Sequence, residues 1–600
     1  MDKGDEGWLA AIAMRVRAGM FNANRYAFGA VTLLAILVGL LAGYAAIGFY
    51  LGIASILDFS FGVDEATLAT GASTLPAWHI IATLVIGGLI VGQILRFITD
   101  HQTQGVSTVI ESAALHNAKI NGKDGLLSAL ATIISLGAGA PLGREGPVVH
   151  LGATLAAFVT RTLKLNPATA RTLLGCGVAS AVAASFNAPI AGVFFALEVI
   201  IGHYALHAFA PIVIAAIAGT LVSRAHMGDF PAFQLTDYTI VSYWEFPAFF
   251  LLGIVAALSA IIFMVGMNKA DKAQKYFSAI PFWLHPPIAG FFIALIAIAY
   301  PEILSVGYEA TSNALNGGYS LTILLALLGT KIIATIIAYG GRFGGGVFSP
   351  SLFIGSMVGG AFGIIAASAF PALASTPGLY AIVGMGAVAS AVLGAPISTM
   401  LIVFEITGDY SITIAVMIAS AVASTVTSTL FKHSFFYMQL ANNGIRLEGG
   451  RATYLLKSAK VADHMTRDFY TVQHTQPATK ARELLVIQGG GILIVTDETG
   501  HMLGTIGFNE LPADIFEAET AQGHTVGDYL HQVSLTVKST DALQIALSRL
   551  DTSGDEILPV VSPTKDTIVV GLIRHKDVIQ EYNRALLETQ GLDGSHQRTN

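Results

Sequence analysis

A chain of 600 residues that is 54% hydrophobic and only 12% charged departs far from the composition of a soluble globular protein. Its formal net charge of -7 is spread over both signs without a basic stripe, which excludes nucleic acid as an expected partner. The single cysteine, Cys176, excludes an intrachain disulfide, and no Cys/His cluster has ligand spacing, so no metal site is expected. With a mean hydropathy of +0.65, these values predict a membrane protein.

The N-terminal segment, residues 1–25, has no short apolar run followed by a cleavage site, so we expect no removable signal peptide and a cytosolic location. Basic residues flank the first apolar run and occur again in an expected loop between two later runs, which the positive-inside rule also places in the cytosol. These residues are Arg15, Arg17, Arg25, Lys269, Lys272 and Lys275.

Residues 26–445 predict a membrane domain. Apolar runs such as Phe28–Tyr50, Trp78–Ile98 and Pro247–Met267 reach the roughly 20 residues needed to cross a bilayer. Other runs, for example Leu126–Ala140, are shorter or interrupted by glycine and proline. Their ends are tolerated inside a membrane only where protein or water covers them, so they indicate transport rather than simple anchoring.

Two segments of this domain resemble each other. The first runs through Asn187-Ala-Pro-Ile190 to Glu198, and the second runs through Gly394-Ala-Pro-Ile397 to Glu405, each after a Val-Ala-Ser-Ala-Val sequence. A duplicated set of interrupted helices predicts a substrate site between two related halves. For the two glutamates, helix capping or bonding between helices is the preferred interpretation.

A Gly-rich segment that ends in proline lies upstream of each copy: Gly143–Pro147 reads Gly-Arg-Glu-Gly-Pro, and Gly344–Pro350 reads Gly-Gly-Gly-Val-Phe-Ser-Pro. Glycine lets the backbone approach a ligand, and proline suits the first helical turn. Because backbone N–H groups at helix N-termini can replace the hydration of a small anion, both segments predict parts of an anion site.

In this order, and separated by the duplicated Asn-Ala-Pro-Ile segment, the two motifs resemble those of the CLC family of chloride channels and transporters. The resemblance covers about residues 26–445. It implies an all-α polytopic membrane fold with two inverted-repeat halves, embedded in the lipid bilayer of the plasma (inner) membrane. It also implies a homodimer with one path for chloride or another small anion in each subunit, and no enzymatic activity.

Glu145 is the expected gate, because an acid among apolar runs is costly unless it has a function. By analogy with the family, its carboxylate occupies the anion site and leaves when it is protonated or displaced by an anion. Proton-coupled members commonly carry a second acid where this chain has Val199, and valine cannot exchange a proton. We therefore favour passive, channel-like conduction, with proton-coupled chloride/proton antiport as the alternative.

The family's anion-coordinating serine and tyrosine align with Val106 and Phe436, each one residue from a hydroxyl side chain, Ser107 or Tyr437. Either hydroxyl reaches the anion only if the register shifts by one residue; otherwise the site depends on backbone amides. The predicted anion-binding residues are Val106, Ser107, Gly143, Arg144, Gly146, Val347, Phe348, Phe436 and Tyr437.

Residues 446–600 are richer in charge and have apolar runs of strand length, which predicts a soluble α+β domain. Two similar units, about 457–515 and 522–586, resemble tandem CBS domains, which we expect in the cytosol. Some CBS pairs bind an adenine nucleotide, and Asp577 is the candidate ribose contact. A packed module without a cofactor is the preferred interpretation.

A remote alternative is a CBS-bearing magnesium channel, in which Glu145, Glu198 and Glu405 would supply the oxygen ligands that magnesium prefers. Against it, Gly-Pro helix starts present their positive dipole ends to the site, and these repel cations.

Overall fold

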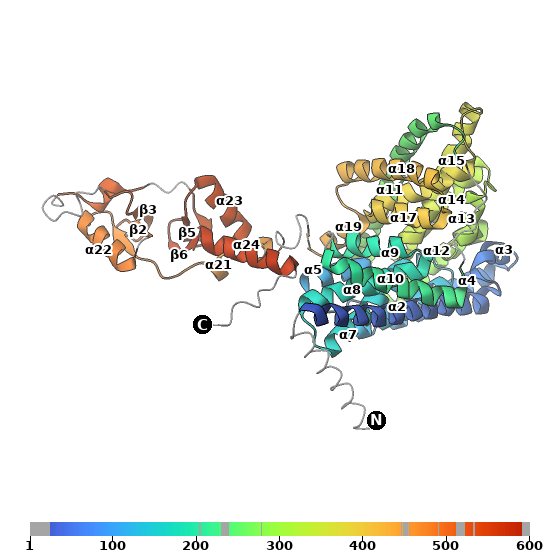
Figure 1. Ribbon diagram of the computed structural model, residues 1–600, viewed down its shortest axis with the longest axis horizontal. Coiled ribbons are helices and arrows are strands. Elements are labelled where there is room, and N and C mark those ends of the chain that lie inside the picture. Colours follow the sequence, from blue (N-terminus) through green and yellow to red (C-terminus); the bar gives the residue numbers. More distant parts are fainter. Residues whose placement is uncertain are drawn as a thin grey trace, which may run out of the picture. The chain divides into compact units, whose positions relative to one another are not determined.

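The computed structural model describes residues 24–202, 206–229, 239–277, 279–445, 447, 454, 456–489, 491–511, 523–531 and 535–590. The expected cytosolic segment, residues 1–25, falls almost wholly outside these residues. The chain divides into two compact units, residues 1–445 and 446–600, which are described separately (Figure 1).

The first unit is built from helices joined by loops. Its first half contains α2 (Asn24–Phe61), η1 (Glu65–Thr67), α3 (Leu68–Ser73), α4 (Ala77–Leu95), α5 (Val106–Leu115), α6 (Gly122–Gly137), α7 (Glu145–Thr162), α8 (Pro167–Phe186), α9 (Pro189–Phe195), η2 (Ala196–Ile201) and α10 (Leu206–Met227). Its second half contains η3 (Tyr243–Glu245), α11 (Phe246–Ala273), η4 (Gln274–Phe277), η5 (Phe282–Leu284), α12 (His285–Ala299), η6 (Pro301–Ile303), α13 (Tyr308–Leu315), α14 (Leu321–Gly340), α15 (Phe348–Ala369), α16 (Pro377–Leu393), α17 (Pro396–Thr407), α18 (Tyr410–Leu430) and α19 (Phe435–Asn442).

Within the described part of the chain, nine helices are long and apolar enough to cross a membrane, and shorter apolar helices lie between them. The first predicted apolar run, Phe28–Tyr50, is shorter than the helix that contains it, because α2 continues to Phe61. The basic loop was also placed wrongly: Lys269 and Lys272 lie on the last turns of α11 itself. A long α-helix can carry lysines at its end, since their flexible stems reach the aqueous boundary.

Equivalent residues of the two halves exchange contacts. Glu198, at the end of the first copy, accepts hydrogen bonds from the amides of Ile397 and Ser398 at the start of α17, at 3.1 and 2.8 Å. Glu405, at the end of the second copy, accepts them from the amides of Ile190 and Ala191 at the start of α9, at 3.0 and 2.8 Å. This reciprocity is that of a local two-fold axis, and it confirms the capping interpretation.

Glycines allow the helices of each half to approach closely. A Cβ added at Gly152 of α7 would lie 2.4 Å from the carbonyl oxygen of Gly177 on α8. A Cβ at Gly355 of α15 would likewise lie 2.4 Å from the carbonyl oxygen of Gly384 on α16. Any larger residue would push these helix pairs apart, so the glycines set the position of the N-termini of α7 and α15.

The second unit consists of two similar α+β repeats. The first contains α21 (Val461–His464), β1 (Thr471–Gln473), α22 (Ala478–Gln488), β2 (Ile492–Thr496) and β3 (Met502–Gly507), and the second contains η8 (Val526–Tyr529), β4 (Val537–Lys538), α23 (Leu543–Ser553), β5 (Ile557–Val561), β6 (Val569–Arg574) and α24 (His575–Gln590). Each three-stranded sheet pairs its first two strands in parallel and its last two antiparallel.

The two repeats complete each other's sheets. Thr466 of the first repeat exchanges two backbone hydrogen bonds with Leu572 on β6, at 2.8 and 2.9 Å. His531 of the second exchanges two with Thr505 on β3, at 2.9 and 3.0 Å. The predicted fold class is confirmed: an all-α membrane domain with two related halves, followed by an α+β domain with a paired repeat.

Candidate functional site

The N-termini of α7 and α15 meet inside the membrane domain. Gly143 and Gly346, each four residues before the proline of its motif, exchange backbone hydrogen bonds of 2.7 Å in both directions. A Cβ at Gly143 would lie only 3.0 Å from the amide nitrogen of Ser349, so a larger residue would disturb this crossing. The sequence motifs thus bring two helix N-termini, with their unpaired amides, to one place.

Glu145, the first residue of α7, turns its carboxylate toward the start of α15. Its Oε1 accepts a hydrogen bond from the hydroxyl of Ser349 at 2.5 Å, and the residue is only 2% exposed. Its Oε2 is buried without a hydrogen-bond partner among the described residues. A carboxylate at a helix N-terminus occupies a place that also suits a small free anion.

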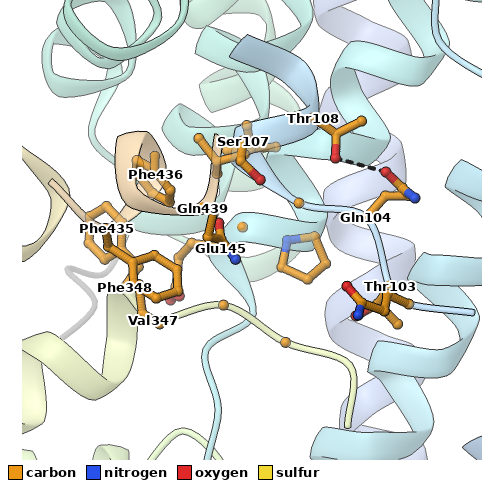
Figure 2. A pocket seen from close by; sticks show the side chains of 18 of the residues that line it. Thr103, Gln104, Ser107, Thr108, Glu145, Val347, Phe348, Phe435, Phe436 and Gln439 are labelled. Atoms are coloured by element: carbon orange, nitrogen blue, oxygen red, sulfur yellow. Dashed lines mark hydrogen bonds between the residues drawn. The ribbon is translucent and has the colours of Figure 1, made fainter. Parts of the chain in front are cut away.

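A cavity of about 620 Å³, which we call the α5–α19 cavity, lies on one side of Glu145. Figure 2 shows Phe348, Phe435 and Phe436 together on one side of it and Gln104 and Thr108 on the other. The predicted site residues that line it are Val106, Ser107, Glu145, Gly146, Val347, Phe348 and Phe436.

One of the two predicted hydroxyls reaches this cavity. Ser107 is among the residues that line it, whereas Tyr437 is not, because α19 turns Phe436 toward the cavity instead. A role for Tyr437 in anion binding stays a prediction.

Three polar residues of the site were missed in the sequence. Ser349 holds Glu145, and its position inside the second Gly-rich motif was the available signal. Tyr339, at the end of α14, and Gln439 on α19 both line the α5–α19 cavity, where the Gln439 amide donates to the Tyr339 hydroxyl at 2.9 Å. One hundred residues separate this pair, so only the fold brings them together.

The structure contains a second cavity, of about 560 Å³, which we call the η1–α13 cavity. Arg144 lines it together with Tyr50, Glu65 and Tyr308, and not the cavity that Glu145 lines. Arg144 therefore lines a different cavity from six of the other predicted anion-binding residues, Val106, Ser107, Gly146, Val347, Phe348 and Phe436.

The two cavities approach each other at the aromatic residues beside α7. Phe186 lines the η1–α13 cavity and Phe348 lines the α5–α19 cavity, and their rings lie 5.0 Å apart. Figure 1 shows α5 and α19 at one end of the helical unit and α3, which follows η1, at the opposite end. Glu145 and this aromatic pair thus stand between two hollows that lie toward opposite ends.

Two other predicted positions of the helical unit, Glu198 and Val199, line neither cavity. Val199 is buried in η2, 4% exposed, and lines neither hollow. The Glu198 carboxylate already accepts hydrogen bonds from the amides at the start of α17. Its oxygens are therefore not available as ligands of a cation site shared with Glu145. Asp577 lies in the first turn of α24, in the second unit.

Comparison with protein families gives two matches. The profile of the voltage gated chloride channel family matches residues 83–428, and that of the CBS domain matches residues 461–511. CLC-f, a chloride channel protein of Arabidopsis thaliana, is 30% identical over 65% of this chain and 52% of its own length. ClcA, an H⁺/Cl⁻ exchange transporter of Vibrio parahaemolyticus, is 29% identical over 65% of this chain and 84% of its own.

Solved structures share the fold. A slow cyanobacterial Cl⁻/H⁺ antiporter superposes with a TM-score of 0.62 at 24% identity, over 69% of this chain and 97% of that one. A eukaryotic CLC transporter covers 91% of this chain and 97% of its own, with a TM-score of 0.61 at 17% identity. Because the family profile spans more than half of the chain, this multi-span membrane protein with a C-terminal CBS domain belongs to the voltage gated chloride channel family.

Proposed function

We propose that this protein conducts chloride through a pathway gated by Glu145. The observation that carries the proposal is the position of the Glu145 carboxylate, buried at the N-terminus of α15 between the α5–α19 and η1–α13 cavities. One side-chain hydroxyl, that of Ser349, holds it there.

In the proposed mechanism, the charged carboxylate of Glu145 takes the place of the transported anion and closes the path. When it is protonated, or when an anion displaces it, the amides of Val347 and Phe348 at the start of α15 bind the anion instead. The Ser349 hydroxyl, released from Glu145, becomes a further donor. The anion then passes Phe186 and Phe348 from one cavity to the other.

For the transport mode we propose passive conduction, supported by Val199. This residue cannot carry a proton, and it is buried and lines neither cavity. A proton leaving Glu145 would have no acid at this position to receive it.

Chloride/proton exchange is the second candidate. Relatives at about 30% identity are named H⁺/Cl⁻ exchange transporters. In addition, Asp100, Glu111 and Asp271 line the same α5–α19 cavity as Glu145, and acids in one water-accessible cavity could pass a proton without Val199.

Chloride efflux from proteoliposomes tests the gate. With Glu145→Gln, a near-isosteric neutral side chain, we expect efflux at neutral pH to exceed that of wild type, because no charged carboxylate remains to close the path. Asp577→Asn, in the other unit, is the control and should behave as wild type. A Glu145→Gln protein with the flux and pH response of wild type would rule out the gate.

Proton movement decides between the two modes. Liposomes with a chloride gradient and a membrane potential set by valinomycin are followed with an external pH electrode. Passive conduction predicts chloride flux without uphill proton transport, whereas exchange predicts protons driven against their gradient by chloride. The second result would reject passive conduction while leaving the Glu145 pathway in place.

Family membership supports the remaining parts of the proposal: a homodimer in the plasma (inner) membrane, with the CBS pair in the cytosol. The α5–α19 cavity, which Ile445 at the end of the helical unit also lines, would then face the cytosol. Adenine nucleotide binding at Asp577 stays a prediction, to be checked by calorimetry with ATP and AMP.

A further inference from the structure

The guanidinium of Arg144 is fixed by three elements in the η1–α13 cavity. Its Nη1 lies 2.9 Å from Oε2 of Glu65 on η1, and its Nη2 donates to the Tyr308 hydroxyl on α13 at 3.2 Å. The rings of Tyr50 on α2 and Tyr308 each lie 4.9 Å from the guanidinium carbon. Arg144 is only 9% exposed, so it is a buried cation in a set position.

Glu65 is the direct counter-ion of this cation, and it is incompletely bonded. It is 9% exposed, and its second oxygen, Oε1, is buried without a hydrogen-bond partner among the described residues. Buried polar atoms are normally paired, so an unpaired carboxylate oxygen that lines a cavity indicates an exchangeable partner there, such as a proton or water.

Two carboxylates compete for Arg144. Glu65 contacts it directly, whereas Oε1 of Glu145 stands 4.0 Å from its Nε. The other nearby acids have partners of their own: Asp64 caps η1 through the amide and hydroxyl of Thr67, and Glu309 accepts from the amides of Ala69 and Thr70.

Arg144 is also the only lysine or arginine among the described residues that line this cavity. While Glu65 is charged, its carboxylate neutralises that cation. An anion that enters the cavity must therefore compete with Glu65 for the guanidinium, which suits planar and spherical anions alike.

We propose that Arg144 forms a second small-anion site in the η1–α13 cavity, and that Glu65 is the tethered competitor that leaves this site to the anion when it takes up a proton. The inference rests on the proposed anion transport but concerns a different acid and a different cavity from the gate. Anion entry from the η1–α13 side then has its own dependence on pH.

The surroundings of Glu65 set the sign of that dependence. Glu65 lies in the connection between α2 and α3, where burial raises the pKa of its carboxyl, Arg144 opposes this rise, and Glu145 and Asp64 add to it. Tyr50 and Tyr308 face Arg144 from the neighbouring helices. Because the charged form is disfavoured, acidification frees Arg144, and anion entry should increase as the pH falls.

The test uses the full chain in liposomes with the gate already neutralised. In Glu145→Gln, chloride flux at about 10 mM external chloride is measured as the pH is lowered from 7 to 5, a range of about two pH units. We expect flux to rise by several fold as pH falls, no more steeply than tenfold per unit, because one group titrates. In Glu145→Gln/Glu65→Gln, flux should be high at pH 7 and independent of pH.

The matched control is Glu145→Gln/Glu309→Gln, which removes an acid from the same cavity but not the partner of Arg144. It should keep the pH response. If Glu65→Gln fails to fold, Glu65→Asp keeps a carboxylate on a stem too short to reach Arg144, and flux at pH 7 should rise above that of Glu145→Gln.

Two results would overturn the inference: flux through Glu145→Gln that does not vary with pH, or a pH response that survives in Glu145→Gln/Glu65→Gln. Failure of the proposed function looks different. In that case either no variant carries chloride, or Glu145→Gln behaves as wild type at every pH.

Discussion

At the scale of single residues, the hydroxyl donors of the site come from unexpected positions. The alignment of motifs placed the coordinating serine and tyrosine of the family at Val106 and Phe436, next to the hydroxyls of Ser107 and Tyr437. Ser107 lines the cavity and Tyr437 does not. Tyr339 supplies a hydroxyl in the same cavity, and because Gln439 donates to its oxygen, the O–H remains able to donate to an anion.

Replacing Tyr339 by phenylalanine should therefore weaken chloride binding from the α5–α19 side. A hydrogen bond to a charged group contributes about 1.5–3 kcal/mol, so we expect the chloride concentration for half-maximal flux to rise by about tenfold or more. The measurement is flux against chloride concentration in proteoliposomes. Tyr437→Phe is the matched control, and an effect of Tyr437→Phe equal to that of Tyr339→Phe would contradict the assignment.

At the scale of helices, the short α9 and α17 depend on each other's half of the chain. Neither begins with a capping side chain of its own, since Ala188 and Ala395 occupy the N-cap positions. The caps are supplied by the other half of the chain: the Glu405 carboxylate caps α9 and the Glu198 carboxylate caps α17. The amides at the start of both helices are thereby satisfied, and the two halves are joined at equivalent points.

Glu405→Gln should destabilise the membrane domain. A glutamine has one acceptor oxygen and would leave one of the amides of Ile190 and Ala191 unpaired, at a cost of about 1–3 kcal/mol. We expect a lower thermal transition of the detergent-solubilised protein, and a similar decrease for Glu198→Gln. The exposed Glu498→Gln serves as control; an unchanged transition in both cap variants would show that water satisfies these amides equally well.

At the scale of the whole molecule, each unit is built from two copies that are incomplete alone. The N-termini of α7 and α15, one from each half, meet where Gly143 and Gly346 pair. In the C-terminal unit, β3 and β6 each take an edge partner from the other repeat, at His531 and Thr466 respectively. The profile of the CBS domain matches residues 461–511 alone, but the structure shows a second repeat with the same strand order.

A chain stopped after Leu511 should therefore carry an unfolded first repeat. It would lose the backbone partners of Thr466 and Thr505, and an unpaired edge in so small a sheet is poorly stable. Limited proteolysis should remove residues 457–511 from this variant quickly, while a chain stopped after Gln590 resists. Equal resistance of the two would show that the first repeat folds by itself.

Much of this architecture could be predicted from local sequence. Hydrophobic runs of membrane length, the two Gly-rich motifs and the Ala-Pro steps before α9 and α17 are short-range signals, and each marks a helix or its start. The duplicated copies also predicted two related halves. These features depend on residues close together in the chain, whose effects on the backbone are set by steric and hydrogen-bonding rules.

The tertiary structure alone decided which of these residues face each other. The pairing of Glu65 with Arg144, of Ser349 with Glu145 and of Gln439 with Tyr339 joins positions 79, 204 and 100 residues apart. Such contacts follow from how the helices pack against one another and from which face each helix turns toward its neighbours. The sequence by itself determined the membrane fold and the place of the anion motifs; packing decided which side chains surround the anion path.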